Sequence, residues 1–161
     1  MSSAAAPRSA EEQARFEKAL TEVFEQRITF NHLLGLKVLS MQPGNVRLGF
    51  EMQPQLIGHF AYGRLHGGVI STALDSLSGL ALMLAIAQRH PGDSAAQVMQ
   101  RFVNIGTIDL RVDFLRQGIG ERFEASAEVL RLGGRVGSVH GRLVNQKQEL
   151  IATSTASFIL S

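Results

Sequence analysis

The residues best suited to chemistry are a histidine, two glycines and an aspartate within one apolar stretch. His66, Gly67 and Gly68 open the stretch from residue 65 to residue 87, and Asp75 is its one formal charge. Backbone N–H groups in the first turn of a helix are unpaired and carry the positive end of the helix dipole. Glycines at such a turn let a ligand approach the backbone closely. The pattern therefore predicts a site for a polarised carbonyl oxygen or a developing oxyanion.

The spacing of Gly68 and Asp75 predicts how they could act together. Asp75 follows Gly68 by seven residues, which is ~700° of helical rotation, so both lie on nearly the same face. They are about 10 Å apart along the axis, too far for one small carbonyl group to touch both. Gly68 of one subunit would then face Asp75 of another across a two-fold axis. The spacing predicts an obligate homodimer with a shared site.

Residues 65 to 87 must form the helix that positions these groups. Strong helix formers occupy nearly every position, and the stretch is apolar almost all round, which predicts a buried helix. A membrane span is the alternative. An aspartate near the centre costs about 2.5–3.5 kcal/mol on insertion scales, and serine, threonine and glycine dilute the stretch. These features favour a core helix, with no membrane as partner.

Composition limits the class of protein. A chain of 161 residues predicts one domain, and a net charge of +2 is too small to indicate nucleic-acid binding. The chain contains no cysteine, which excludes disulfides, thiol catalysis and a cysteine-based metal site. No apolar signal segment is evident near residue 1, so a cytoplasmic location is expected.

The N-terminal third divides into a leader and a helical segment. Residues 1–8 are expected to be a disordered leader, and residues 9–35 an N-terminal helical segment. Ser9 and Glu12 have the form of a capping box, and an amphipathic helix follows to about Gln26. A short second helix should stop at Gly35. Residues 89–104 are polar and either hold a short helix near 95–102 or act as a lid.

Period-two alternation predicts an antiparallel sheet in the rest of the chain. After Gly106, Ile108 and Leu110 should face one side of a strand and Thr107 the other. The predicted strands are 36–41, 46–52, one starting at 106, 122–132, 135–145 and 149–160. Short connections between consecutive strands indicate antiparallel neighbours. Residues 36–161 are therefore expected to form an α+β domain, a sheet wrapped around one long helix.

Three features of the chain resemble those of a known family. Leu65-His66-Gly67-Gly68, Asp75 further along, and the later strand from Thr107 to Arg116 are similar to the signature of the hotdog-fold acyl-CoA thioesterases of the phenylacetate-pathway (PaaI-like) type. The resemblance covers about residues 30 to 160. It implies hydrolysis of an acyl-CoA thioester to a free acid and coenzyme A. Coenzyme A is then part of the substrate, with no separate cofactor and no metal, and the homodimers are expected to assemble into a tetramer.

The resemblance also implies roles for individual residues. Asp75 would be either the general base that activates water or the nucleophile on the thioester. The Gly68 N–H would donate to the oxyanion, Gly67 would allow close approach, and His66 would orient the turn or the thioester. The Thr107 hydroxyl would assist the carboxylate. Structural alternatives remain open: a dimer-bridging Asp75, a buried histidine with satisfied nitrogens, and an ordinary strand threonine.

Substrate-binding residues are expected in the loops. Relatives often carry an asparagine before the His-Gly-Gly motif, and His59 stands at about that place here, so it either replaces that donor or the contact is absent. Arg64, Arg131 and Arg135 lie at loop or strand ends, where they either bind coenzyme A phosphates or are solvated charges.

Two other functions compete with hydrolysis. Gly58-His59-Phe60 also resembles a motif of hotdog 3-hydroxyacyl thioester dehydratases, but the glutamate of that family is replaced by Ala73 here. A non-catalytic acyl-CoA-binding module is the other alternative. The sequence does not indicate the preferred acyl chain.

Overall fold

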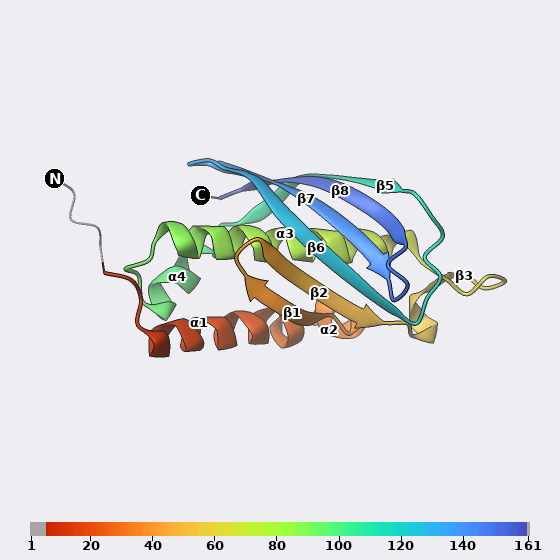
Figure 1. Ribbon diagram of the computed structural model, residues 1–161, viewed down its shortest axis with the longest axis horizontal. Helices are drawn as coiled ribbons and strands as arrows, with labels where there is room; N and C mark the ends of the chain where they lie inside the picture. Colours follow the sequence, from red (N-terminus) through yellow and green to blue (C-terminus); the bar gives the residue numbers. More distant parts are fainter. Residues whose placement is uncertain (1–5, 161) are drawn as a thin grey trace.

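The structure is a computed structural model that describes residues 6–160, which form a curved antiparallel sheet around one long helix (Figure 1). The helical elements include a π-helical turn, η1, and a 3-10 turn, η2; in chain order they are α1 (Ala10–Glu22), η1 (Val23–Arg27), α2 (Thr29–Leu34), η2 (Pro54–Leu56), α3 (Gly67–Arg89) and α4 (Ala95–Arg101). The strands are β1 (Lys37–Gln42), β2 (Asn45–Glu51), β3 (Ile57–His59), β4 (Arg64–Leu65), β5 (Gly106–Phe114), β6 (Arg122–Leu132), β7 (Val136–Asn145) and β8 (Leu150–Ile159). The predicted α+β hotdog fold is confirmed.

The main sheet has six strands in the order β1-β2-β6-β7-β8-β5, and every neighbouring pair is antiparallel. The ends of β1, β2, β6, β7 and β8 fall within about a residue of the predicted ones, because alternation and turn residues mark them clearly. Within the described residues, β5 pairs only with β8, so its other edge faces outward.

Helix α3 is the predicted core helix. Its length and composition also suit a membrane span, yet most of that apolar window is buried inside this fold. Leu74, Leu77 and Leu80 in this helix are completely buried. Strand β7 places glycine beneath the helix: a Cβ on Gly137 would lie 2.5 Å from Cδ2 of Leu82. Because Gly137 has no side chain, the helix can pack closely onto the sheet at this position.

The N-terminal helices cover the side of the core that the sheet leaves open. Ser9 caps α1, as predicted, by accepting a hydrogen bond from Glu12 N–H at 3.2 Å. The Glu12 carboxylate accepts instead from Ala95 N–H at 2.8 Å, at the start of α4. Phe16 packs against Phe102, so α4 lies on α1 rather than over the start of α3. The predicted helix to Gln26 continues past Glu22 as the π-helical turn η1.

The expected leader is only partly visible, since residues 1–5 lie outside the described residues. Arg8, its last residue, is held against the end of α3. Its guanidinium donates hydrogen bonds to the carbonyl oxygens of Asp93, His90 and Ala87 at 2.8, 3.1 and 3.3 Å. Order in the described chain therefore begins before the first helix.

Strand β5 departs from the alternation predicted for it. Its pairing with β8 slips between Thr107 and Asp109, which leaves Ile108 in a bulge. A bulge adds one residue to a strand and reverses the faces on either side of it. Thr107 therefore points toward α3, as does Leu110, whereas Ile108 is exposed. The prediction that Thr107 and Leu110 lie on opposite faces is wrong for this reason.

The segment before α3 is more ordered than a loop. It forms η2 and then a small hairpin of β3 and β4, which projects beyond the end of the sheet where α3 begins (Figure 1). A two-residue strand carries no alternation that could have indicated it.

Candidate active site

His66 is the N-cap residue of α3 and orders its first turn. Its Nδ1 atom accepts a hydrogen bond from the Gly68 N–H at 2.9 Å. Nδ1 is therefore unprotonated, and the proton of the neutral imidazole resides on Nε2. The side chain is exposed, so it can rotate without displacing core residues.

The two glycines after His66 differ in what their amides contact. The Gly68 N–H, predicted to bind an oxyanion, is engaged by His66 in this structure. The Gly67 N–H forms no hydrogen bond with residues 6–160. A Cβ on Gly67 would lie 3.4 Å from Cζ of Phe114, so the ring of Phe114 lies against this glycine. Phe114 belongs to β5, and no local pattern in the sequence links it to Gly67.

The first turn of α3 is held from outside the helix. His66 N–H donates to the Leu56 carbonyl at 2.8 Å, and Leu65 N–H donates to the Gly118 carbonyl at 2.9 Å. A Cβ on Gly58 would lie only 2.4 Å from Cα of His66. Glycine is therefore required there for the β3–β4 hairpin to pack against the N-cap residue.

Asp75 lies two turns further along α3, half-buried, and forms a defined contact with β5. The Thr107 hydroxyl donates a hydrogen bond to Oδ1 of Asp75 at 2.8 Å. No further hydrogen bond links this carboxylate to the described residues, so Oδ2 is free for water or substrate. The structure thus brings together two of the predicted site residues within one chain.

Between Gly68 and Asp75, the partly exposed stripe of α3 carries small hydroxyl side chains. The hydroxyls of Ser71 and Thr72 donate to the carbonyls of Gly67 and Gly68 at 2.9 and 2.8 Å. Their protons are therefore used within the helix. The helix start and the carboxylate remain separated by ~10 Å along the axis.

A second contact next to Asp75 was not anticipated from the sequence. The hydroxyl of Ser76 donates to Oδ1 of Asn31, on α2, at 2.8 Å. Asn31 is buried, and its Nδ2 atom has no partner among residues 6–160. Two polar residues 45 positions apart show no local pattern that could have linked them.

His59 and Arg64 pair across the β3–β4 hairpin at the start of α3. The His59 ring stacks with that of Phe60 and is tilted against that of Tyr62, with centroid distances of 5.6 and 4.7 Å. Its Nδ1 is buried without a partner in the described chain. Its neighbour Gly58 lies against His66, so His59 is in the same region as His66.

Arg131 and Arg135 lie elsewhere, beside the β6–β7 turn, where they border a cavity of about 310 Å³. Arg89, the last residue of α3, donates to the Gly133 carbonyl in that turn at 2.9 Å. The two arginines are thus at the opposite end of α3 from His66 (Figure 1). Within one chain the structure does not bring them to the helix start.

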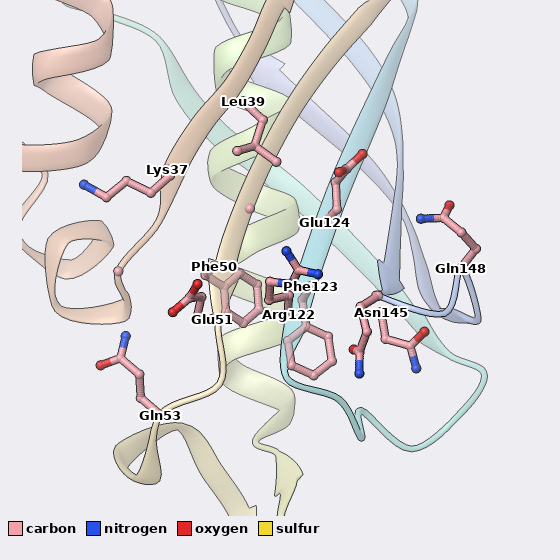
Figure 2. Close-up of a pocket in the computed structure, with 13 residues that line it drawn as sticks. Lys37, Leu39, Phe50, Glu51, Gln53, Arg122, Phe123, Glu124, Asn145 and Gln148 are labelled. Carbon is pink, nitrogen blue, oxygen red and sulfur yellow. The ribbon is translucent and has the colours of Figure 1, made fainter.

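A larger groove of about 670 Å³ lies on the outer side of the sheet. Figure 2 shows Lys37, Leu39, Glu51, Arg122 and Glu124 around it, on β1, β2 and β6. It contains none of the predicted site residues. This groove is separate from the site at α3.

Comparisons with known proteins show the family of the chain. The family model that matches residues 62–152 describes the thioesterase superfamily. The medium/long-chain acyl-CoA thioesterase YigI of Escherichia coli strain K12 is 39% identical over 143 residues, which are 89% of this chain and 92% of that protein.

Solved structures match over most of the chain. A protein from Shewanella oneidensis related to the thioesterase superfamily has a TM-score of 0.87 and 34% identity, covering 95% of this chain and 100% of that one. A variant of the phenylacetic acid degradation protein PaaI from Thermus thermophilus has a TM-score of 0.63 and 25% identity, covering 83% of this chain and 99% of that one.

Proposed function

The chain belongs to the thioesterase superfamily, and from that premise we propose that it hydrolyses medium- and long-chain acyl-CoA thioesters within the PaaI-like branch. The products are a free acid and coenzyme A, and no cofactor is required. The relative YigI, which is named for this activity, supports the substrate class. Nucleic acid and membrane have no part in the proposal, and the expected location is the cytoplasm.

The observation that carries the proposal is the hydrogen bond from Thr107 to Asp75. It fixes one carboxylate oxygen and leaves the other for reaction. As general base, Asp75 removes a proton from water, and the resulting hydroxide attacks the thioester carbonyl carbon. As nucleophile, Asp75 attacks that carbon itself, displaces the coenzyme A thiolate and forms an anhydride, which water then hydrolyses. In both routes the thiolate leaves and takes up a proton.

The start of α3 stabilises the negative charge that develops on the thioester oxygen. In the proposal, Gly68 N–H donates to this oxygen once His66 rotates away, and Gly67 leaves room for the substrate. The helix dipole adds a favourable potential at the same position. In the free protein, the Gly68 N–H therefore donates to His66 instead of to a substrate.

The site is proposed to be shared by two subunits. Asp75 and Gly68 lie on one partly exposed stripe of α3, ~10 Å apart along the axis, and antiparallel packing of two such helices would bring Gly68 of each subunit to Asp75 of the other. The outward edge of β5 offers a second contact, since an open strand edge pairs readily with another chain. The proposed assembly is a homodimer, with two dimers forming a tetramer.

Coenzyme A phosphates are proposed to contact arginines. Arg64 lies beside the start of α3 and can serve the site of its own chain. Arg131 and Arg135 are at the far end of α3, so they can reach this coenzyme A only from the second subunit. His59 takes the position of the missing asparagine donor.

The competing activities find less support. A dehydratase would need a carboxylate at position 73, yet Ala73 is buried in the core. A non-catalytic module would bind acyl-CoA without releasing thiol. Neither alternative accounts for a carboxylate held by Thr107.

The test is thiol release from dodecanoyl-CoA, followed with a thiol-reactive dye. We expect turnover by the wild type and a loss of at least ~10²-fold in kcat for Asp75→Asn, the scale of general acid–base catalysis. Glu128→Gln, on the exposed side of β6, is the matched carboxylate-to-amide control. A folded Asp75→Asn variant with near wild-type kcat would contradict the assignment, and binding without thiol release by the wild type would favour the module.

A further inference from the structure

Helix α2 presents apolar side chains to solvent beside the candidate site. Phe30 is 54% exposed and Leu33 is 61% exposed, and Ile28 precedes them at the helix start with partial exposure. Phe30 and Leu33 are three residues apart, so they share one helix face. Asn31 and Leu34, on the adjoining face of α2, are buried. We call Ile28, Phe30 and Leu33 the α2 patch.

The α2 patch is tied to the helix that carries the candidate carboxylate. Asn31 is 1% exposed and accepts the hydroxyl proton of Ser76 at 2.8 Å. Ser76 directly follows Asp75 in α3, so this bond fixes α2 within a helical turn of the carboxylate. Buried hydrogen bonds of this kind set position because their loss leaves unsatisfied polar groups.

Asn31 also carries a buried polar atom that the Ser76 contact does not satisfy. Its Nδ2 donor is buried and has no partner among residues 6–160. An exposed apolar patch and an unpartnered buried donor therefore adjoin each other beside Asp75. The exposed patch is the surface at this junction that a hydrocarbon group can cover, because the shielded Asn31 donor offers such a group no hydrogen bond.

We propose that the α2 patch seats the acyl chain of the substrate, which rests on the proposed thioesterase function. Three partly exposed side chains present on the order of 300 Å², well below the ~800 Å² per partner of a stable protein interface. That area suits a single hydrocarbon chain. The acyl group then runs from the carbonyl at Asp75, past Ser76, onto Phe30 and Leu33.

This position gives the N-terminal helical segment a role in substrate choice. Each methylene removed from water strengthens binding about fourfold. Acyl chains long enough to reach the α2 patch therefore bind more tightly than shorter ones. Short acyl groups end before Phe30 and gain nothing. Selectivity for chain length would therefore reside in α2, whereas the reaction itself resides in α3 and β5.

The test compares chain lengths in a variant that makes the patch polar. Glutamine is a good helix former, so the double variant Phe30→Gln, Leu33→Gln removes apolar surface while favouring the helix. Leu130→Gln is the matched control, because Leu130 is similarly exposed at the distant end of β6. kcat/KM is measured for butanoyl-, octanoyl- and dodecanoyl-CoA, with the molar mass of the assembly determined by light scattering.

We expect the double variant to lose at least ~10-fold in kcat/KM for dodecanoyl-CoA and less than ~2-fold for butanoyl-CoA, because methylene burial alone is removed. Unchanged values for all three substrates, an equal loss for all three, or a changed molar mass would overturn the proposal. The last result would assign the patch to subunit contact.

Failure of the proposed thioesterase function can be told apart from failure of the proposed acyl seat. If the wild type releases no thiol from any substrate, hydrolysis is refuted, and calorimetric binding of dodecanoyl-CoA decides the acyl seat. Weaker binding by the double variant than by Leu130→Gln supports the seat, and equal binding refutes it.

Discussion

Thr107 donates its hydroxyl proton to Asp75 across the interface between β5 and α3, and a bulge in β5 makes the contact possible. Without the extra residue at Ile108, strict alternation would point Thr107 away from the helix on which Leu110 packs. The bulge therefore re-aims one side chain of an otherwise regular strand. Bulges are common next to active sites for this reason.

Replacing Thr107 with valine removes the hydroxyl but keeps the shape of the side chain, and so tests this contact. Thr107→Val should lower kcat about 10- to 100-fold, because a hydrogen bond to a charged group contributes about 1.5–3 kcal/mol. Thr107→Ser keeps a hydroxyl and should retain most of the activity. Steady-state kinetics with circular dichroism as a fold control provides the measurement. Equal rates for the valine and serine variants would show that the hydroxyl has no catalytic part.

A methyl group at Gly68 should disturb the helix start. Its Cβ would lie 3.0 Å from Nδ1 of His66, tighter than ordinary contacts. Gly68→Ala keeps the N–H but crowds both the imidazole and an approaching thioester. We therefore expect KM to rise and kcat to fall together, with the helix retained. Unchanged kinetics would place the oxyanion donor at another residue.

Ser76 should contribute to stability through Asn31. Ser76→Ala leaves the buried Oδ1 of Asn31 without its donor, which costs about 1–3 kcal/mol. Urea unfolding of the variant measures this loss. Ser126→Ala, on the exposed side of β6, is the control and should change the unfolding free energy by less than about 0.5 kcal/mol. If both variants unfold alike, Ser76 does not anchor α2.

Much of the fold could be predicted because its signals are local. The strands with clear alternation, such as β2 with Val46, Leu48 and Phe50 buried, were located within about a residue. The end of α2 at Gly35 was also predictable, since Gly35 adopts a φ of 69° there. The bulge at Ile108 was not, because it depends on the register with β8 rather than on β5 itself.

In the candidate site, too, local features could be predicted from the sequence and features set by tertiary packing could not. The His66 turn and the carboxylate at Asp75 belong to one helix, so their spacing could be read directly. The hydrogen bond between His66 and Gly68 depends on a side-chain rotation that the sequence does not encode locally. Asn31 and Phe114 reach the site from distant segments, and tertiary packing alone places them there.

In the proposed dimer, Gly68 of one subunit works with Asp75 of the other. The decisive measurement is thiol release by purified mixed dimers, co-expressed with two different tags from Asp75→Asn and Gly68→Val chains that are each inactive alone. One of the two sites then combines an intact Gly68 with an intact Asp75, so activity per dimer should return to about half of the wild-type value. Folded mixed dimers that remain inactive would contradict the claim and require a site built within one chain.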